Sequence, residues 1–223
     1  IGTGILVVNC ILTKYSTGYH IWDCKLAWIP ISGKLALTTQ LLFMPCVGIT
    51  KISMCLTYLR LFPSKINRWF CHCAVIWLVA WTIGTFFVFI FQCWPISANW
   101  DILIIDKPCS NQRVFFIITA VLNNFSDILV FLWPARYLWN IQLPQKQRAG
   151  LVISFGIGCL ACIAGACRIW YLRIYFSSSD STWEGAVTYV TTAIETNLGI
   201  VCGSLPGVKP ILARLFPWVF GST

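Results

Sequence analysis

The sequence is short of charged residues and of histidine, and both shortages narrow the classes of protein it can be. Charged side chains make up only 10% of the 223 residues, whereas hydrophobic side chains make up 58%. The surface of a soluble domain of this length would need far more charge. The two histidines, His20 and His72, do not form a metal-binding pair, and the chain shows no nucleophile-elbow or paired-carboxylate motif. We therefore expect a polytopic membrane protein that is not an enzyme and has no metal site and no cofactor.

The basic residues are not gathered into a nucleic-acid-binding surface, although the net charge is +9. Nucleic-acid-binding domains place Lys and Arg on one solvated face. Here these residues stand singly or in threes at the ends of apolar runs, which is typical of charges beside lipid headgroups. The sequence shows no secretory signal peptide, low-complexity stretch or soluble-domain linker. We expect no nucleic-acid partner, and a single transmembrane domain over residues 1–223.

Long apolar runs dominate the sequence. A helix needs about 20 apolar residues to cross roughly 30 Å of hydrocarbon. Five runs meet this length: residues 35–59, 70–91, 114–133, 150–170 and 186–205. A sixth run, residues 1–13, is shorter and reads as the second half of a span, so we expect a fragment that lacks the first helix. Because lipid admits only helices or closed barrels, and these runs are too long and too uniform for barrel strands, the sequence predicts an all-α transmembrane helix bundle with about six helices.

The basic residues of the connections predict the orientation of the bundle. One set of connections contains eight of them: Arg60, Lys65, Arg68, Arg136, Lys146, Arg148, Lys209 and Arg214. The other set contains six: Lys14, Lys25, Lys34, Lys107, Arg113 and Arg173. Cytoplasmic loops carry the excess of Lys and Arg. We therefore expect a multi-pass protein of the plasma membrane whose C-terminus is cytoplasmic.

The cysteines divide into span residues and loop residues. Seven of the twelve lie inside predicted spans, where a thiol behaves as a small hydrophobic group: Cys10, Cys46, Cys55, Cys159, Cys162, Cys167 and Cys202. Cys93 ends one span and Cys109 lies just before the next, on the predicted extracellular side, which is oxidising. We expect a Cys93–Cys109 disulfide that ties the loop down and stabilises it by about 3 kcal/mol. Two free thiols, or a bridge from Cys24 on the same side, are the alternatives.

Four charged residues fall within the predicted spans: Lys51, Asp127, Arg168 and Glu195, with Arg168 near the extracellular end. Each charge costs about 2.5–3.5 kcal/mol at mid-helix, so such residues face the bundle interior and pair. Lys51 and Asp127 each precede a basic residue at the end of their span by nine positions, which places both about 13 Å above the cytoplasmic edge. Glu195 lies at most a turn or two higher. Lys51, Asp127 and Glu195 are therefore predicted to share one layer near the midplane.

Polar neighbours extend this layer, and its charges do not balance. Asn123 and Asn124 precede Asp127 by four and three residues and so share its helix face. Two carboxylates and one ammonium leave an excess negative charge, so that one acid is protonated, or a cation or polar ligand completes the site. Two interpretations stay open. The layer is either a structural network that specifies helix packing, or a switch or ligand site whose ion pairs differ between two states of the bundle.

Six sequence blocks occur in an order that resembles a known family: "GYHIWD", "TKISMCLTYLRLFP", "FQCWPISANWD" followed by "KPC", "NNFSDILVFLWP", "FGIGCLACIAGACRIWYL" and "AIETNLGIVCGSLPGVKPIL". They resemble the fungal integral membrane proteins with a "rhodopsin domain", which include Pth-type G-protein-coupled-receptor-like proteins, from about Gly18 to Leu212. The resemblance implies seven transmembrane helices and an extracellular N-terminus. The chain departs from the pattern in lacking the first span and an eight-cysteine CFEM module, and in having Cys24.

The resemblance also adds site residues. The family pattern is matched at Lys51, Ser53, Tyr58, Arg60, Pro63, Cys93, Cys109, Asn124, Asp127, Arg168, Glu195, Asn197, Pro206 and Pro210. The predicted intramembrane polar network or ligand site is therefore Lys51, Asn123, Asn124, Asp127, Arg168, Glu195 and Asn197. Retinal opsins attach retinal to a lysine in the middle of the last helix. Residues 186–205 contain no lysine, so light sensing is not expected.

Two functions from different classes are consistent with these features. The first is a receptor-like membrane protein that senses an unknown ligand and signals through its basic cytoplasmic loops, to a heterotrimeric G protein or another cytoplasmic effector. The second is a secondary transporter or proton-coupled carrier, because acids and a lysine at the midplane are typical of proton relays. We find no internal repeat of the kind that many transporters show, which favours the receptor.

Overall fold

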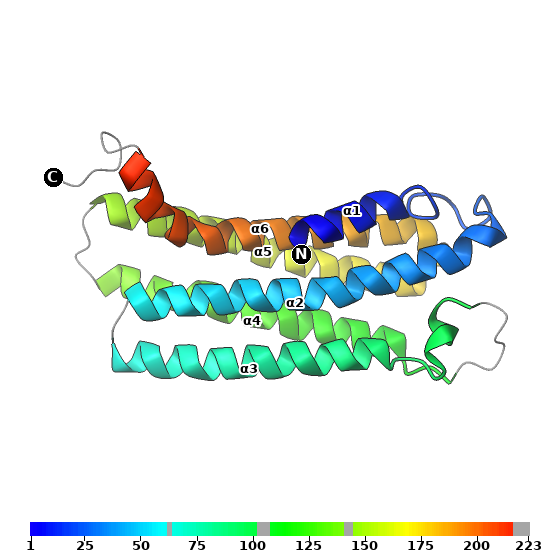
Figure 1. The fold of residues 1–223 in the computed structure, drawn as a ribbon, viewed down its shortest axis with the longest axis horizontal. Coiled ribbons are helices and arrows are strands. Elements are labelled where there is room, and N and C mark those ends of the chain that lie inside the picture. The colour runs from blue at the N-terminus through cyan, green and yellow to red at the C-terminus, as the bar shows by residue number, and fades with distance from the viewer. Residues whose placement is uncertain (62–63, 102–107, 141–144, 216–223) are drawn as a thin grey trace.

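The computed structural model describes residues 1–61, 64–101, 108–140 and 145–215. Over these residues the chain forms six α-helices and no strand (Figure 1). The helices are α1 (Gly2–Leu12), α2 (Ile29–Leu61), α3 (Lys65–Ile90), α4 (Gln112–Asn140), α5 (Gln145–Ser177) and α6 (Ser181–Leu215). Two short 3-10 helices, η1 (Leu26–Trp28) and η2 (Ile96–Asn99), lie in connections. The prediction of an all-α helix bundle is confirmed; that residues 1–223 form a single domain stays a prediction.

Four of the described helical segments are long and apolar enough to cross a membrane: Leu26–Arg60, Lys65–Ile90, Gln112–Trp133 and Phe155–Ser177. They correspond to the predicted spans 35–59, 70–91, 114–133 and 150–170. The predicted span 186–205 lies in α6, which is not among the four. This helix carries four threonines, a glutamate and an asparagine between residues 188 and 197, and these polar groups lower its hydropathy.

The helices lie lengthwise beside one another, and neighbours in the sequence run in opposite directions (Figure 1). Helix α2 packs against α1, α3, α4 and α6, whereas α5 packs against α4 and α6. The α1–α2, α3–α4 and α5–α6 connections lie at one end of the bundle, which we call the disulfide end. The end of α2, the start of α3, the end of α4 and the start of α5 lie at the other end, which we call the basic end. Exposed Arg60, Lys65 and Arg68 mark the basic end.

Apolar side chains cover the outer surface of the bundle, as a lipid environment requires. On α3, Trp69, Ile76 and Phe87 are 75%, 69% and 53% exposed. Soluble monomers rarely expose a continuous apolar surface of this kind. Inside a bilayer the same surface contacts acyl chains, and the helical backbone satisfies its own hydrogen bonds.

Two apolar clusters fill the interior, one toward each end. The cluster toward the basic end contains Met54, Cys55, Tyr58, Cys71, Leu78, Val130, Phe131, Ala161 and Cys202. The cluster toward the disulfide end contains Ile5, Phe43, Met44, Cys46 and Phe89. On α2, Lys51 lies between residues of the two clusters, so the buried charges form a polar layer that separates two apolar regions.

A hydrogen-bonded junction joins three helices at the basic end. The Asn67 side chain on α3 is fully buried and donates from Nδ2 to the Tyr58 carbonyl oxygen on α2 at 2.9 Å. It accepts at Oδ1 from Trp133 Nε1 on α4 at 2.8 Å. The Trp133 ring also stacks on Phe70 of α3, with 3.6 Å between ring centroids. Hydrogen bonds and ring stacking therefore join helices α2, α3 and α4 at the basic end.

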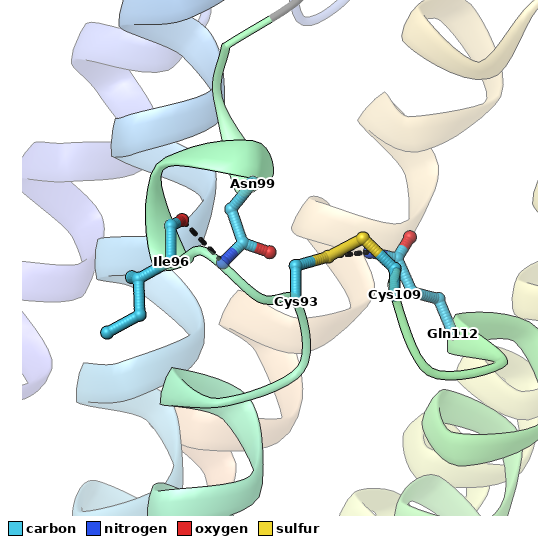
Figure 2. Close-up of a disulfide and its surroundings, with 5 residues drawn as sticks. All are labelled: Cys93, Ile96, Asn99, Cys109 and Gln112. Carbon is cyan, nitrogen blue, oxygen red and sulfur yellow. Dashed lines mark hydrogen bonds between the residues drawn. A yellow bond between two sulfur atoms is a disulfide. The ribbon is translucent and has the colours of Figure 1, made fainter. Parts of the chain in front are cut away.

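The loop at the disulfide end is closed as the sequence predicted. Cys93 and Cys109 form a disulfide, which Figure 2 shows, and Cys24 is free. Backbone hydrogen bonds flank the bridge: Trp94 N donates to Pro108 O at 3.3 Å, and Ser110 N donates to Gln92 O at 2.9 Å. The loop that carries η2 is thereby fixed to the ends of α3 and α4.

Candidate functional site

Lys51 is buried at the interface of α2 with α4, and four oxygen atoms surround its ammonium. The side chain is 3% exposed. Its Nζ atom lies 3.0 Å from Asp127 Oδ1 and donates to Asn123 O and Oδ1, both at 2.9 Å, and to Ser126 Oγ at 2.7 Å. Residues 123, 126 and 127 share one face of α4, because they are three or four positions apart. One carboxylate and three neutral oxygens thus make the buried charge tolerable.

Asn123 connects the two acidic residues of the layer. Its Nδ2 atom donates to Glu195 Oε1 at 2.7 Å and, more weakly, to Asp127 Oδ2 at 3.4 Å. Its Oδ1 atom accepts from Lys51. An amide can do both because it carries an acceptor oxygen and a donor nitrogen. Asn123 therefore joins α2, α4 and α6 into one network.

Arg168 on α5 supplies the second positive charge. Its Nε atom lies 3.2 Å from Glu195 Oε2, and the two side chains are only 7% and 4% exposed. The contact is an ion pair without the alignment of a hydrogen bond, since neither atom has a hydrogen-bond partner. The guanidinium carbon also lies 4.9 Å from the centroid of the Phe43 ring, in a cation–π contact.

The layer is therefore electrically balanced, with two basic and two acidic side chains. The expected excess of negative charge was wrong, because Arg168 was placed near the extracellular end of its span. The predicted span ended at residue 170, whereas α5 continues to Ser177. Arg168 then lies nine residues, about 13 Å, inside the helix end. The predicted span stopped short of the helix end, because α5 continues through residues 171–177.

The structure brings together five of the seven predicted site residues: Lys51, Asn123, Asp127, Arg168 and Glu195. That they serve a ligand or a switch stays a prediction. It also adds Ser126, which the sequence analysis missed although it stands three residues after Asn123 and next to Asp127 on the same helix face.

The other two predicted residues, Asn124 and Asn197, lie apart from the network. Asn124 faces α5, where its Oδ1 atom would lie 2.6 Å from a Cβ atom added at Gly165. Asn197 is exposed and donates to Ala193 O on its own helix at 2.7 Å. The prediction grouped Asn124 with the charged layer because it precedes Asp127 by three residues, and Asn197 because of the family pattern. Neither reason fixes the direction of the side chain.

A cavity of about 230 Å³ lies on the disulfide side of the charged layer, among α2, α3, α4, α5 and α6. Its walls include the aromatic rings of Phe43, Phe89, Phe116, Phe176 and Tyr189. Arg168 also lines it, so one residue belongs both to the cavity and to the charged layer. The sequence analysis did not predict this cavity, because its lining residues come from five helices and only the packing of those helices brings them together.

The disulfide loop contributes to the rim of this cavity. Asn99 of η2, Gln92 at the end of α3 and Gln112 at the start of α4 all line it. Figure 2 shows Asn99 Nδ2 donating to Ile96 O, at 3.0 Å, and Gln112 Nε2 contacting Cys93 Sγ, at 3.8 Å. The Cys93–Cys109 bridge therefore positions polar side chains around the cavity.

A second polar contact at the disulfide end joins the α1–α2 connection to the α5–α6 turn. His20 Nδ1 lies 2.5 Å from Asp180 Oδ2, and Ile21 N donates to Asp180 Oδ1 at 3.1 Å. The His20 ring stacks between Trp22 and Trp183, with centroids 4.7 and 4.6 Å away. The hydrogen bond with His20 lowers the pKa of the Asp180 carboxyl below its ordinary value. Among the described residues, no group of three His, Cys, Asp or Glu could hold a metal ion.

Comparisons with known proteins identify relatives. The chain is 29% identical to a SAT4 family membrane protein of Emericella nidulans, over 96% of this chain and 54% of that protein. It is 28% identical to the Fugralins biosynthesis cluster protein 2 of Gibberella zeae, over 86% of this chain and 50% of that protein. It is 22% identical to the Receptor GIN3 of Arthrobotrys oligospora, over 85% of this chain and 46% of that protein.

The chain spans about half the length of the curated relatives it matches. No solved structure gives a significant match. The family model described as the fungal rhodopsin domain matches residues 1–214, nearly the whole chain. The charged layer and the cavity at the disulfide end both lie within this match. The chain belongs to the fungal rhodopsin domain family of membrane proteins.

Proposed function

We propose that this protein is a seven-helix receptor-like protein of the plasma membrane, which binds its ligand in the cavity at the disulfide end. One observation carries the proposal: Arg168 lines the cavity and also pairs with Glu195 in the charged layer. A ligand that contacts Arg168 acts directly on an ion pair between α5 and α6. With the disulfide end outside, the C-terminus and the basic end face the cytoplasm.

The charged layer offers a route from the cavity to the basic end. A shift of Arg168 changes the environment of Glu195, which Asn123 connects to Lys51 and to α4. Helix α4 also carries Trp133, whose hydrogen bond to Asn67 reaches the α2–α3 turn. A movement of α4 would therefore change the arrangement of exposed basic residues around that turn, which is the kind of helix shift that receptors and switches use. A heterotrimeric G protein or another cytoplasmic effector would read it.

The names of the relatives support a role in sensing small molecules. One of these relatives is named a receptor, and another is named for the fugralins biosynthesis cluster. Each name applies to the relative itself. Together with the cavity, they favour a small-molecule cue for this protein over a peptide or a protein ligand.

The test compares strains of the host fungus that lack the full-length protein, carry the wild type, or carry Arg168→Gln at equal surface expression. We expect Arg168→Gln to change basal cyclic AMP or phosphorylated mitogen-activated protein kinase, because Glu195 loses its charged partner. Asn197→Ala, on the exposed side of α6, is the control and should behave as wild type. Identical signalling in all four strains would contradict the proposal.

The second candidate is a proton-coupled carrier, which four buried ionisable groups favour. Transport measurements on the purified full-length protein in proteoliposomes distinguish the two functions. Uptake of a solute driven by a pH gradient, lost in Lys51→Met and accompanied by no signalling change in the fungus, would favour the carrier. The absence of such uptake, with altered signalling in Arg168→Gln, is the expected outcome for a receptor.

A further inference from the structure

We infer that the cavity at the disulfide end binds a small uncharged molecule with an apolar ring system and a head group that both donates and accepts hydrogen bonds. The inference deepens the proposed function, since it names the chemical class of the ligand. It rests on the size of the cavity, its aromatic walls, its unpartnered polar atoms and the charge balance beneath it.

The volume limits the ligand to a small molecule. An engineered apolar cavity of about 150 Å³ holds benzene, whereas sites for drug-sized ligands occupy about 300–1,000 Å³. The cavity here, of about 230 Å³, lies between these values. It therefore suits a ligand of about the size of a bicyclic ring with a short substituent, and it is too small for a peptide.

Aromatic side chains with defined contacts form the walls. Phe116 packs edge-on against Phe89, with centroids 5.3 Å apart, and tilted against Phe176, with centroids 5.8 Å apart. Phe43 closes the wall near Arg168. Rings held by such contacts form a preformed apolar surface that favours a flat apolar body by burial and by aromatic stacking.

Several polar atoms in the same walls have no partner within the protein. They are Gln40 Oε1, Gln92 Oε1, Asn99 Oδ1, Thr119 Oγ1 and Thr188 Oγ1. Thr119 is only 2% exposed. Two other threonines of the cavity behave differently, since Thr39 donates to Leu35 O at 3.1 Å and Thr192 to Thr188 O at 2.7 Å. Buried polar groups are normally satisfied, so Thr119 and Thr188 are the hydroxyls left available to a ligand.

The charges favour an uncharged ligand. Among the described residues that line the cavity, Arg168 is the one Lys, Arg, Asp or Glu side chain, and Glu195 already balances it. An anion would leave the buried layer with an excess negative charge, and a cation would be repelled by Arg168, so a charged ligand is disfavoured beside the buried pair. A hydroxyl or an amide instead supplies one acceptor, which matches Arg168 Nε, and one donor, which matches Thr119 Oγ1; both atoms belong to lining residues and have no hydrogen-bond partner.

The experiment uses four probes with one ring system and different head groups, added to the full-length protein in nanodiscs. They are 2-naphthylethanol, 2-ethylnaphthalene, 2-naphthylacetate and 2-naphthylethylammonium. Ligand-observed NMR measures binding, and empty nanodiscs correct for partition into lipid. We expect the alcohol to bind at least fivefold more tightly than each of the other three.

Matched variants locate the binding. Thr119→Val removes the hydroxyl at nearly constant volume and should weaken the alcohol about five- to tenfold, whereas Thr119→Ser should bind it as wild type does. Leu172→Trp on α5 and Ala120→Leu on α4 each place a larger side chain in the cavity wall and should abolish binding of the alcohol. Circular dichroism and size-exclusion chromatography confirm that each variant is folded.

Three results would overturn the inference: tighter binding of the acetate or the ammonium, alcohol binding that survives both cavity-filling variants, or no binding of any probe. Because these measurements use purified protein, they do not depend on signalling. A failure of the probe series removes the ligand class and leaves the Arg168→Gln signalling test intact. A failure of that signalling test leaves the binding result intact.

Discussion

The Lys51–Asp127 and Arg168–Glu195 pairs lie in the same buried layer, but the protein holds them differently. The ammonium of Lys51 has four oxygen neighbours, all on one face of α4. The Arg168–Glu195 contact, at 3.2 Å, is unaligned, and Arg168 lines a cavity. The hydrogen-bond donors of Lys51 in the first pair all have partners, and the pair is buried. The second pair has atoms without a hydrogen-bond partner and lies beside the cavity.

This difference separates two roles that a buried charge can have. A saturated pair fixes the position of α2 against α4, because any movement breaks several hydrogen bonds together. An unaligned pair tolerates small movements, and a group in the cavity can contact it. A buried ion pair is weak evidence for stability in itself. The contrast therefore has to be tested by removing each pair in turn.

Among substitutions by uncharged residues, the largest effect is expected from Lys51→Met. It leaves Asp127 buried without its charged partner, and breaking a buried pair in this way costs about 3–5 kcal/mol. The free energy of unfolding, measured by SDS titration in mixed micelles, should fall by this amount. The double variant Lys51→Met/Asp127→Leu removes both charges and should recover most of the loss. A double variant as unstable as the single one would show that the pair is not coupled.

Charge reversal is a second test of the Lys51–Asp127 pair. Lys51→Asp alone should prevent stable folding, since it places two carboxylates side by side. Lys51→Asp/Asp127→Lys restores one charge of each sign at the α2–α4 contact and should recover part of the stability. No recovery with Asp127→Lys, and none with Glu195→Lys, would remove the support for this pairing.

Arg168→Met should destabilise the protein less than Lys51→Met, by about 1–3 kcal/mol. Glu195 loses its charged partner but keeps the hydrogen bond from Asn123 at 2.7 Å. The same titration provides the measurement, and Arg168→Gln, which retains a donor, should lose less than Arg168→Met. If Arg168→Met costs as much as Lys51→Met, the two pairs are held equally tightly and the proposed division of roles is wrong.

Ser126→Ala gives a smaller effect within the saturated pair. It removes one neutral oxygen, 2.7 Å from Lys51 Nζ, and leaves the other three. A hydrogen bond to a charged group contributes about 1.5–3 kcal/mol, and the remaining oxygens should keep the loss near the lower value. Asn197→Ala is the control and should change the unfolding free energy by less than about 0.5 kcal/mol, as exposed positions usually do. Equal losses in the two variants would mean that Ser126 does not contribute to the site.

The sequence predicted that Lys51, Asp127 and Glu195 share a layer, because charged residues are rare in membrane spans. The depth of each one follows from the number of residues between it and the end of its span. Lys51, Asp127 and Glu195 lie within a few turns of the midplane on any helical reading, and lipid forces them inward. Arg168 was misplaced because its depth depended on the end of α5, and helix ends extend beyond the apolar run that reveals them. The sequence also does not show which way a side chain points, so Asn197 was grouped with the network although it lies on the exposed side of α6.

The cavity could not be predicted from the sequence for a related reason. A charged residue in a span is conspicuous, but Thr119 and Thr188 resemble Thr39 and Thr192 until their hydrogen bonds are known. The apolar rings that form the walls resemble the rings that face lipid. Which helix face points inward depends on how α2 to α6 pack together, which is a property of the whole bundle and not of any one span.

The smallest effect is expected at the His20–Asp180 contact, an ionic contact outside the membrane-spanning layer. The folded-state pKa of Asp180 is lowered by its hydrogen bond with His20, so the ionised carboxylate stabilises the folded state. This contribution is present above the unfolded value of about 3.9, and it is lost as the pH falls through the lower folded value. Asp180→Asn should therefore lower the melting temperature slightly at pH 7, and the difference from wild type should shrink below about pH 4. A difference that stays constant down to pH 3 would show that the carboxylate charge contributes nothing, as is common for solvent-screened pairs. It would also leave Lys51–Asp127 and Arg168–Glu195 as the stabilising ion pairs among the residues that the structure describes.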